Sequence, residues 1–264
     1  MLSGIESMKM MLINIFPLLI LSVSIHSKSD NSSLENGDLN RFITFAGARF
    51  DVRENGKSPN RYIWLHGDEQ TARMALEHHI TKYHGIAFFI ASKTREVPFK
   101  KTIIDPNRIF SRNGAYHALR KFKPDWGSLV LEQALDDLDE ERKVFLDILM
   151  PAQGGKLISV HNNFRGYNVY KEEERSQKIS IKKDQNPRDF IICTHIDDYK
   201  ILALSPFNVV LQNLPPEKDD GSLSWEALRR NVRYFNIETR LGYLTQQKKI
   251  YYSILEIVEQ HLGS

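Results

Sequence analysis

Residues 61–83 read RYIWLHGDEQTARMALEHHITKY, and this stretch decides the predicted fold. The short apolar run at residues 62–65 indicates a buried strand that ends at His66. Gly67 permits a tight turn, and the helical pattern that follows places Glu69 at the start of a helix. The turn thus brings an imidazole and a carboxylate together, as a zinc site requires, although each residue also suits an ordinary strand end or first helical turn.

The composition suits one domain with its own core. Of the 264 residues, 41% are hydrophobic and 26% are charged, which is enough apolar material for one substantial core. The formal net charge is only +3 and the basic residues are dispersed, so nucleic acid is not an expected partner. Cys193 is the only cysteine, so no intramolecular disulfide can form, and its apolar neighbours predict a buried side chain without chemistry.

The N-terminus differs from the rest of the chain. An apolar stretch at residues 10–25 follows a lysine and precedes small residues, which predicts a signal peptide over residues 1–27. The stretch is shorter than the ~20 residues that cross a bilayer, and Pro17 interrupts it, so we expect no stable membrane span after cleavage. Polar residues 28–40 predict a flexible linker. We expect a single folded domain over residues 41–264 in an exported protein, periplasmic or secreted.

Strand and helix signals alternate along this domain. An all-apolar run at residues 86–90 follows the first helix and completes a strand–helix–strand unit, which implies parallel strands with both faces covered. Further elements are expected as follows: strands at 156–160, 190–194, 208–212 and 232–239, an edge hairpin at 42–52, and helices at 128–149 (one or a pair), 224–228 and from 240 onward. The sequence therefore predicts an α/β fold with a mostly parallel mixed β-sheet and helices on both faces.

Two histidines are expected at the carboxyl ends of strands. His161 follows the strand at residues 156–160, as His66 follows the first strand. In an open parallel sheet these ends form the ligand crevice, so the two imidazoles are expected to lie close together. The polar residues 165–189 predict an exposed loop or a hairpin over this crevice. His195, in a predicted loop, is a weaker candidate ligand.

Three further polar side chains are candidates for function. Pro106 prevents a helix at the preceding aspartate and shapes a loop that presents Asn107 and Arg108. A guanidinium can hold a carboxylate through two hydrogen bonds and an amide can add another, although Arg108 alone also suits a surface ion pair. Glu238 ends an apolar strand, where a carboxylate is costly without a partner, so it is the candidate general base.

The order of these motifs resembles the zinc carboxypeptidase superfamily, including its succinylglutamate desuccinylase and aspartoacylase branch. The motifs are His-x-x-Glu at 66–69, Asp-Pro-Asn-Arg-x-Phe at 105–110, a histidine at 161 and Asn-x-Glu at 236–238, and the resemblance covers roughly residues 60–260. It implies one Zn²⁺ ion with three protein ligands, His66, Glu69 and His161. It also implies that Glu238 activates water and that Asn107 and Arg108 hold a substrate carboxylate. The further tyrosine and arginine of digestive carboxypeptidases have candidates in Tyr234, Tyr243 and Arg112.

The expected function is that of an exported zinc-dependent hydrolase. It would cleave an amide or peptide bond next to a free carboxylate, as a carboxypeptidase does, with cell-wall peptides among the substrates considered. An N-acyl-amino-acid deacylase of the same fold is a second possibility. A catalytically silent binding protein that keeps the pocket is a third, and the presence of Glu238 argues against it. The expected partner is therefore a peptide or an N-acyl amino acid with a free carboxylate.

Overall fold

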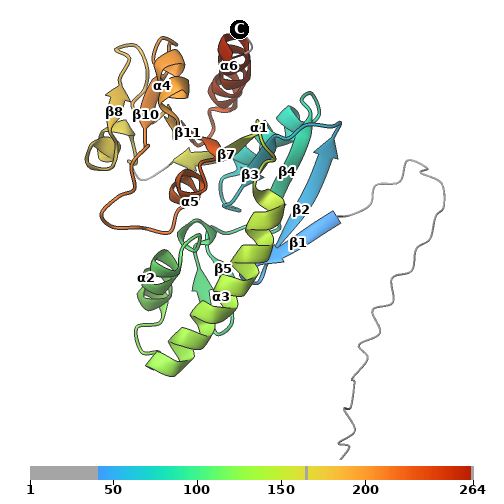
Figure 1. The fold of residues 1–264 in the computed structure, drawn as a ribbon, viewed down its shortest axis with the longest axis vertical. Coiled ribbons are helices and arrows are strands. Elements are labelled where there is room, and N and C mark those ends of the chain that lie inside the picture. The colour runs from blue at the N-terminus through green and yellow to red at the C-terminus, as the bar shows by residue number, and fades with distance from the viewer. Residues whose placement is uncertain (1–40, 164–165, 263–264) are drawn as a thin grey trace, which may run out of the picture. The chain divides into compact units, whose positions relative to one another are not determined.

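The fold is known from a computed structural model that describes residues 41–163 and 166–262 (Figure 1). The predicted signal peptide and linker, residues 1–27 and 28–40, lie outside the described residues. By the contacts within the chain, Asn40–Ser264 forms one compact unit. Among the described residues, no helix combines the length and the apolar character needed to cross a membrane.

One mixed sheet of nine strands forms the centre of the described structure. Its order from edge to edge is β1 (Arg41–Phe45), β2 (Ala48–Asn55), β4 (Gly85–Ile90), β3 (Arg61–Trp64), β7 (Lys156–Asn163), β11 (Arg233–Arg240), β9 (Phe190–Cys193), β10 (Asn208–Leu211) and β8 (Lys178–Ser180). The central strands β4, β3, β7 and β11 run parallel, as do β9 and β10, while the other pairs are antiparallel. The edge hairpin predicted at residues 42–52 is confirmed as β1 and β2. A separate small hairpin comprises β5 (Val97–Phe99) and β6 (Thr102–Ile104).

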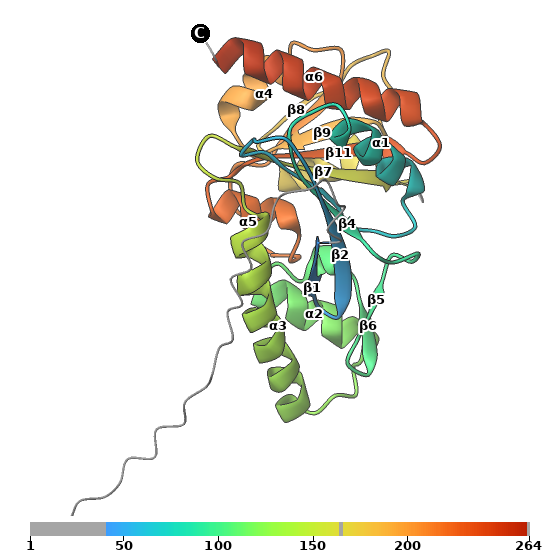
Figure 2. The same cartoon turned by 90° about the vertical axis from the view of Figure 1, so that its right-hand side faces the viewer.

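Helices cover both faces of the sheet, as predicted (Figure 2). The helices on one face are α1 (Gln70–Ile80), α4 (Ile196–Leu202) and α6 (Leu244–Leu262), and those on the other are α3 (Ser128–Leu149) and α5 (Leu223–Arg229). Helix α2 (Arg112–Phe122) packs against α3. Two short 3₁₀ turns complete the set, Pro106–Arg108 and Val169–Arg175. The predicted α/β class is confirmed, and α3 is one continuous helix.

Three local predictions differ from the structure. Residues Asp197 and Asp198, expected in a loop, form the first turn of α4, where the helix dipole favours acidic side chains. Helix α5 follows the N-cap residue Ser222 and begins at Leu223, one residue before the predicted start at 224. Helix α2 was not anticipated, although Ser111 caps it by accepting a hydrogen bond from the backbone of the third helical residue.

The central pair of strands, β7 and β11, presents matching polar residues on one face. In register, Ser159 lies opposite Asn236, and His161 lies opposite Glu238. Side chains of paired residues in a sheet point to the same side, so these four share the face covered by α5.

The opposite face of the same strands ties them to α1. Asn162 donates from Nδ2 to Thr239 Oγ1 at 3.2 Å and to Gln247 Oε1 at 3.1 Å. Its Oδ1 accepts from the backbone N–H of Ala72 at 2.7 Å, in the first turn of α1. All of these groups are buried, where unmatched polar atoms cost stability, so the network fixes where α1 begins relative to β7.

His79 on α1 is a packed histidine. Its ring centroid lies 3.9 Å from that of Tyr251 and 4.6 Å from that of Tyr83. Neither ring nitrogen has a hydrogen-bond partner among the described residues, and the residue is 1% exposed. Burial, with a smaller contribution from His78, lowers the pKa of His79 to about 3, so the ring is neutral at pH 7.

Acid should therefore destabilise the fold through His79. The unfolded chain binds a proton on this ring near pH 6.5 and the folded chain only near pH 3, so stability falls as pH drops through that window. Between pH 7 and pH 5 the loss is about 2 kcal/mol. A His79→Phe variant keeps the aromatic packing, so its drop in unfolding free energy over this interval, measured by urea denaturation, should be about 2 kcal/mol smaller. An equal drop in both proteins would contradict this account.

Candidate metal centre

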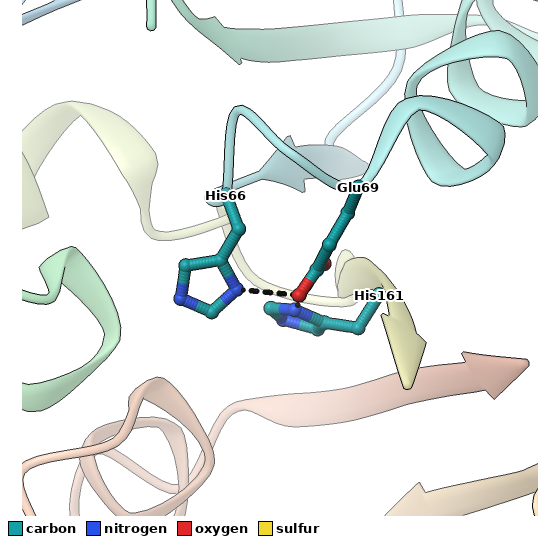
Figure 3. A group of neighbouring side chains, drawn as sticks. All are labelled: His66, Glu69 and His161. Carbon is teal, nitrogen blue, oxygen red and sulfur yellow. Dashed lines mark hydrogen bonds and ion pairs between the residues drawn. The ribbon is translucent and has the colours of Figure 1, made fainter. Parts of the chain in front are cut away.

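His66, Glu69 and His161 meet at the carboxyl ends of β3 and β7 (Figure 3). One ligand atom from each lies within 4.8 Å of the others, and all three residues are buried. The carboxylate of Glu69 lies between the imidazoles, with Oε1 2.9 Å from His66 Nδ1 and Oε2 3.0 Å from His161 Nδ1. Among the described residues this is the only such group of three histidine, cysteine or acidic side chains.

The loop between β3 and α1 is shaped to hold this arrangement. Gly67 has no room for a Cβ atom, because the backbone of Ser92 passes directly over it. Trp64 Nε1 donates to the Glu69 carbonyl at 3.0 Å, which fixes the end of the strand. The backbone N–H of Asn162 donates to Glu69 Oε2 at 3.1 Å and adds a hydrogen bond from β7. The predicted tight turn is confirmed. Its glycine is needed because the backbone of Ser92 lies too close for a Cβ atom.

The tautomer of His66 is set by a second carboxylate. His66 Nε2 lies 2.9 Å from Asp105 Oδ1, so Asp105 accepts the Nε2–H proton. The Nδ1 lone pair then faces Glu69. Asp105 itself accepts from the backbone N–H of Asn107 at 2.8 Å and from Arg95 Nε at 3.2 Å.

Two lone pairs face each other across the contact between His66 Nδ1 and Glu69 Oε1, so a positive charge is needed there. Burial opposes the charged imidazole, but Glu69 and Asp105 outweigh it and raise the pKa of His66 to about 9. Burial also opposes ionisation of Glu69, but the two histidines hold the pKa of its carboxyl well below the usual range. A divalent cation meets the same need as the proton, and two imidazole nitrogens with a carboxylate are a known ligand set for catalytic zinc. The residues present therefore fit Zn²⁺.

The metal centre lines a cavity of about 250 Å³ that also contains Glu238. A line of hydrogen bonds orients this side chain. Tyr234 Oη and Ser159 Oγ lie 2.6 Å apart, Ser159 Oγ donates to Asn236 Oδ1 at 3.2 Å, and Asn236 Nδ2 donates to Glu238 Oε1 at 3.1 Å. The second carboxylate oxygen has no protein partner among the described residues. Burial raises the pKa of Glu238 to about 7, although His161 lowers it. A cation bound at the metal centre would add to the effect of His161 and lower the pKa of Glu238.

Asn107 and Arg108 reach the same cavity from the loop after β6. Asn107 Oδ1 accepts from the backbone N–H of Leu223 at 2.9 Å, so this amide joins the loop to α5. Arg108 Nη1 donates to the Asn107 carbonyl at 2.8 Å and lies 3.6 Å from Asp220 Oδ2. Its Nε and Nη2 groups have no hydrogen-bond partner in the described part of the chain. Arg108 therefore has donors that can bind a ligand.

Arg112 does not line this cavity, and its predicted role in substrate binding is corrected accordingly. Its guanidinium lies against the acidic side of α3, 2.7 Å from Glu132 and 2.9 Å from Asp136, and it also contacts Asp139. Arg112 is the first residue of α2, so these ion pairs join the two helices. The reason is local: the helix that begins at this residue turns its side chain toward α3.

The two tyrosine candidates and His195 occupy different places in the fold. Tyr234 lies at the cavity, whereas Tyr243 stacks under the Arg240 guanidinium, 3.6 Å from its ring centroid. His195 lies beside Asp197 and Asp198 in a different hollow, away from the two site histidines. Tyr234 is thus the one of these three residues that is placed to contact a bound ligand.

Sequence reasoning missed several residues of the cavity. Arg95 bridges the site, since Nη1 donates to Glu69 Oε1 at 3.0 Å while its Nε binds Asp105. No pattern marked it, because it lies in a polar stretch without periodicity. The segment at residues 165–189, expected as an exposed loop or hairpin, contributes Glu172, which is fully buried in the cavity wall. One of its hydrogen-bond partners, Gln212, is 40 residues away in the sequence.

No protein-family model and no curated protein sequence matches this chain. Solved structures with a similar fold include a succinylglutamate desuccinylase/aspartoacylase from Rhodobacter sphaeroides, with 15% identity and a TM-score of 0.39, covering 79% of this chain and 58% of that one. Another is the product-bound ectoine utilization protein EutE (DoeB) from Ruegeria pomeroyi, with 14% identity and a TM-score of 0.41, covering 81% and 60%. The chain spans about three-fifths of each structure's length.

Removal of one imidazole should abolish tight metal binding. A His161→Ala variant leaves two protein ligands, which cannot hold zinc in a catalytic geometry. The measurement is zinc content after dialysis against excess zinc and then buffer, with circular dichroism to confirm the fold. His195→Ala is the matched control and should retain the wild-type content. Stoichiometric zinc in folded His161→Ala would remove His161 from the ligand set.

Proposed function

We propose that this protein is a zinc-dependent amidohydrolase that cleaves an amide bond next to a free carboxylate. The observation that carries the proposal is the convergence of His66, Glu69, His161, Glu238 and Arg108 on one cavity. These residues supply the separate needs of such a reaction: ligands for a metal, a proton acceptor and a cationic clamp.

The chain's residues divide the chemistry among them. When bound, zinc would polarise the scissile carbonyl and lower the pKa of the attacking water. Glu238 keeps one oxygen on Asn236 and offers the other, so it can take a proton from water and pass it to the leaving amine. Arg95 is held by Glu69 and Asp105, and its Nη2 group is available to stabilise negative charge that develops on the carbonyl oxygen.

The size of the cavity favours small substrates. About 250 Å³ is at the lower limit for ligand pockets and suits an amino-acid-sized group better than a long peptide. Arg108 would bind the free carboxylate of that group. We therefore propose cleavage of N-acyl amino acids or of the last residue of short peptides, cell-wall peptides included. Export remains a prediction from residues 1–27.

The proposal is tested first with a substrate panel. Zinc-loaded protein is incubated with N-acetyl amino acids, dipeptides and D-amino-acid muropeptides, and the released amine is quantified. Release from N-acetyl amino acids alone would favour the deacylase form, and release from peptides would favour the exopeptidase form. Binding without any release would favour a silent binding protein.

Glu238→Gln should separate catalysis from metal binding. The amide keeps the shape of the side chain but cannot accept the proton, so kcat should fall by ~10²–10⁴. Zinc content should equal that of the wild type, because Glu238 is outside the ligand set. Undiminished turnover with full zinc occupancy would assign the base to another residue.

Arg108→Ala should lower kcat/KM for substrates that have a free carboxylate. The expected loss in kcat/KM is about 2–3 kcal/mol, near the lower end for an unpaired charge, because the Arg108 side chain is 38% exposed. The measurement is a double-mutant cycle that compares free-acid and amidated forms of one substrate. Arg112→Ala, whose guanidinium is outside the cavity, is the control and should match the wild type. Additive losses in the cycle would show that Arg108 does not bind the carboxylate.

A further inference from the structure

The cavity wall away from the metal ligands contains a buried carboxylate that belongs to Glu172. Glu172 is completely buried, and both of its oxygens are occupied. Oε1 accepts from Tyr167 Oη and from Arg175 Nη2, each at 2.5 Å, and Oε2 accepts from Gln212 Nε2 at 2.6 Å. The third guanidinium of the cavity, that of Arg175, is therefore already paired with a carboxylate.

Asp220 pairs the same guanidinium a second time and reaches Arg108. Asp220 Oδ2 lies 3.1 Å from Arg175 Nη1 and 3.6 Å from Arg108 Nη1. The loop that carries it cannot withdraw easily, because Gly221 and Gly114 are in backbone contact and neither has room for a Cβ atom. Asp220 is thus a fixed carboxylate between the two arginines.

The charges of the cavity limit how many anionic groups a ligand can bring. Its lining contains four carboxylates (Glu69, Glu172, Asp220, Glu238), three guanidiniums (Arg95, Arg108, Arg175) and the charged imidazole of His66, a formal balance of zero. A divalent cation that replaced the imidazolium proton would change this balance to one positive charge. One substrate carboxylate neutralises it, whereas a second would be a buried excess charge without a partner.

Gln212 supplies an acceptor that lacks a donor. Its Nε2 group is oriented by Glu172, which leaves Oε1 without a hydrogen-bond partner among the described residues. The residue lines the cavity and is only 2% exposed, and this oxygen is a buried acceptor without compensation beside the ligand space.

From these contacts we propose that the amino acid bound in the cavity has one carboxylate and a side chain that ends in a hydrogen-bond donor. Carboxamide and ammonium groups fit, and a second carboxylate is rejected by Asp220 and Glu172. Asp220 is then a specificity residue, since it pairs with Arg175, the guanidinium that a second carboxylate would need. This inference deepens the proposed function and rests on Arg108 holding the first carboxylate.

Equilibrium binding of the released amino acids tests the inference without turnover. Isothermal titration calorimetry of zinc-loaded protein compares glutamine, lysine and glutamate, of which glutamine and glutamate have nearly the same shape. Wild type should bind glutamine or lysine at least about tenfold more tightly than glutamate. Asp220→Asn removes a charge 3.6 Å from Arg108 and should tighten glutamate about tenfold more than it tightens glutamine.

The neighbouring carboxylate offers a matched control. Asp219 and Asp220 each accept from the backbone N–H two residues ahead, at 2.8 and 3.1 Å, and asparagine preserves that acceptor. Asp219 pairs with Arg229 and does not line the cavity, so Asp219→Asn should keep the wild-type preference.

Three results would overturn the inference: equal or tighter binding of glutamate by wild type, equal effects of the two substitutions, or no binding of any amino acid below roughly 10 mM. The proposed function is tested separately, by measuring hydrolysis of the N-acetyl forms of the same amino acids. Selective binding without hydrolysis would refute the amidohydrolase and leave the specificity intact. Hydrolysis without selective binding would refute the specificity and leave the proposed amidohydrolase function intact.

Discussion

The rest of the site depends on one shared carboxylate. Glu69 lies between the Nδ1 atoms of His66 and His161, and the Asp105 contact turns the His66 lone pair toward it. This arrangement is stable only with a positive charge at its centre. The buried polar groups around it, including the Arg95 bridge, are placed so that the carboxylates stay ionised and oriented. The site is therefore organised for a cation before any substrate enters.

The sheet explains how residues far apart in sequence reach this point. Parallel strands β3 and β7 are neighbours, so the residues at their carboxyl ends are adjacent. The register of β7 with β11 then places Glu238 beside His161. On the other face, Asn162 anchors the start of α1 and with it Glu69. A shift of one residue in this register would turn the side chains of His161 or Glu238 to the opposite face of the sheet.

The sequence predicted the parts of the site whose position follows from strand periodicity and turn chemistry. His66, Glu69, His161 and Glu238 each lie at or beside a strand end, and short patterns were sufficient to expect their convergence. Arg112 lies outside the cavity because it begins α2, a helix that was not predicted and whose first residue forms ion pairs with α3. The cavity wall at Glu172 was hidden for a different reason. Its burial depends on three partners, one of them 40 residues away, and no local pattern encodes such a network.

Gly221 is in close backbone contact with Arg108 and with Gly114 of α2, which joins the loop that carries Asp105 and Arg108 to the loop that carries Asp220. Since the two backbones touch without intervening side chains, the loops are expected to move as a single body. Evolution of new specificity is constrained by this coupling. An insertion near Asp220 that enlarged the cavity would also shift Asp105, and with it the imidazole of His66. Change at this wall is therefore restricted to exchanges of side chains that leave the backbone in place.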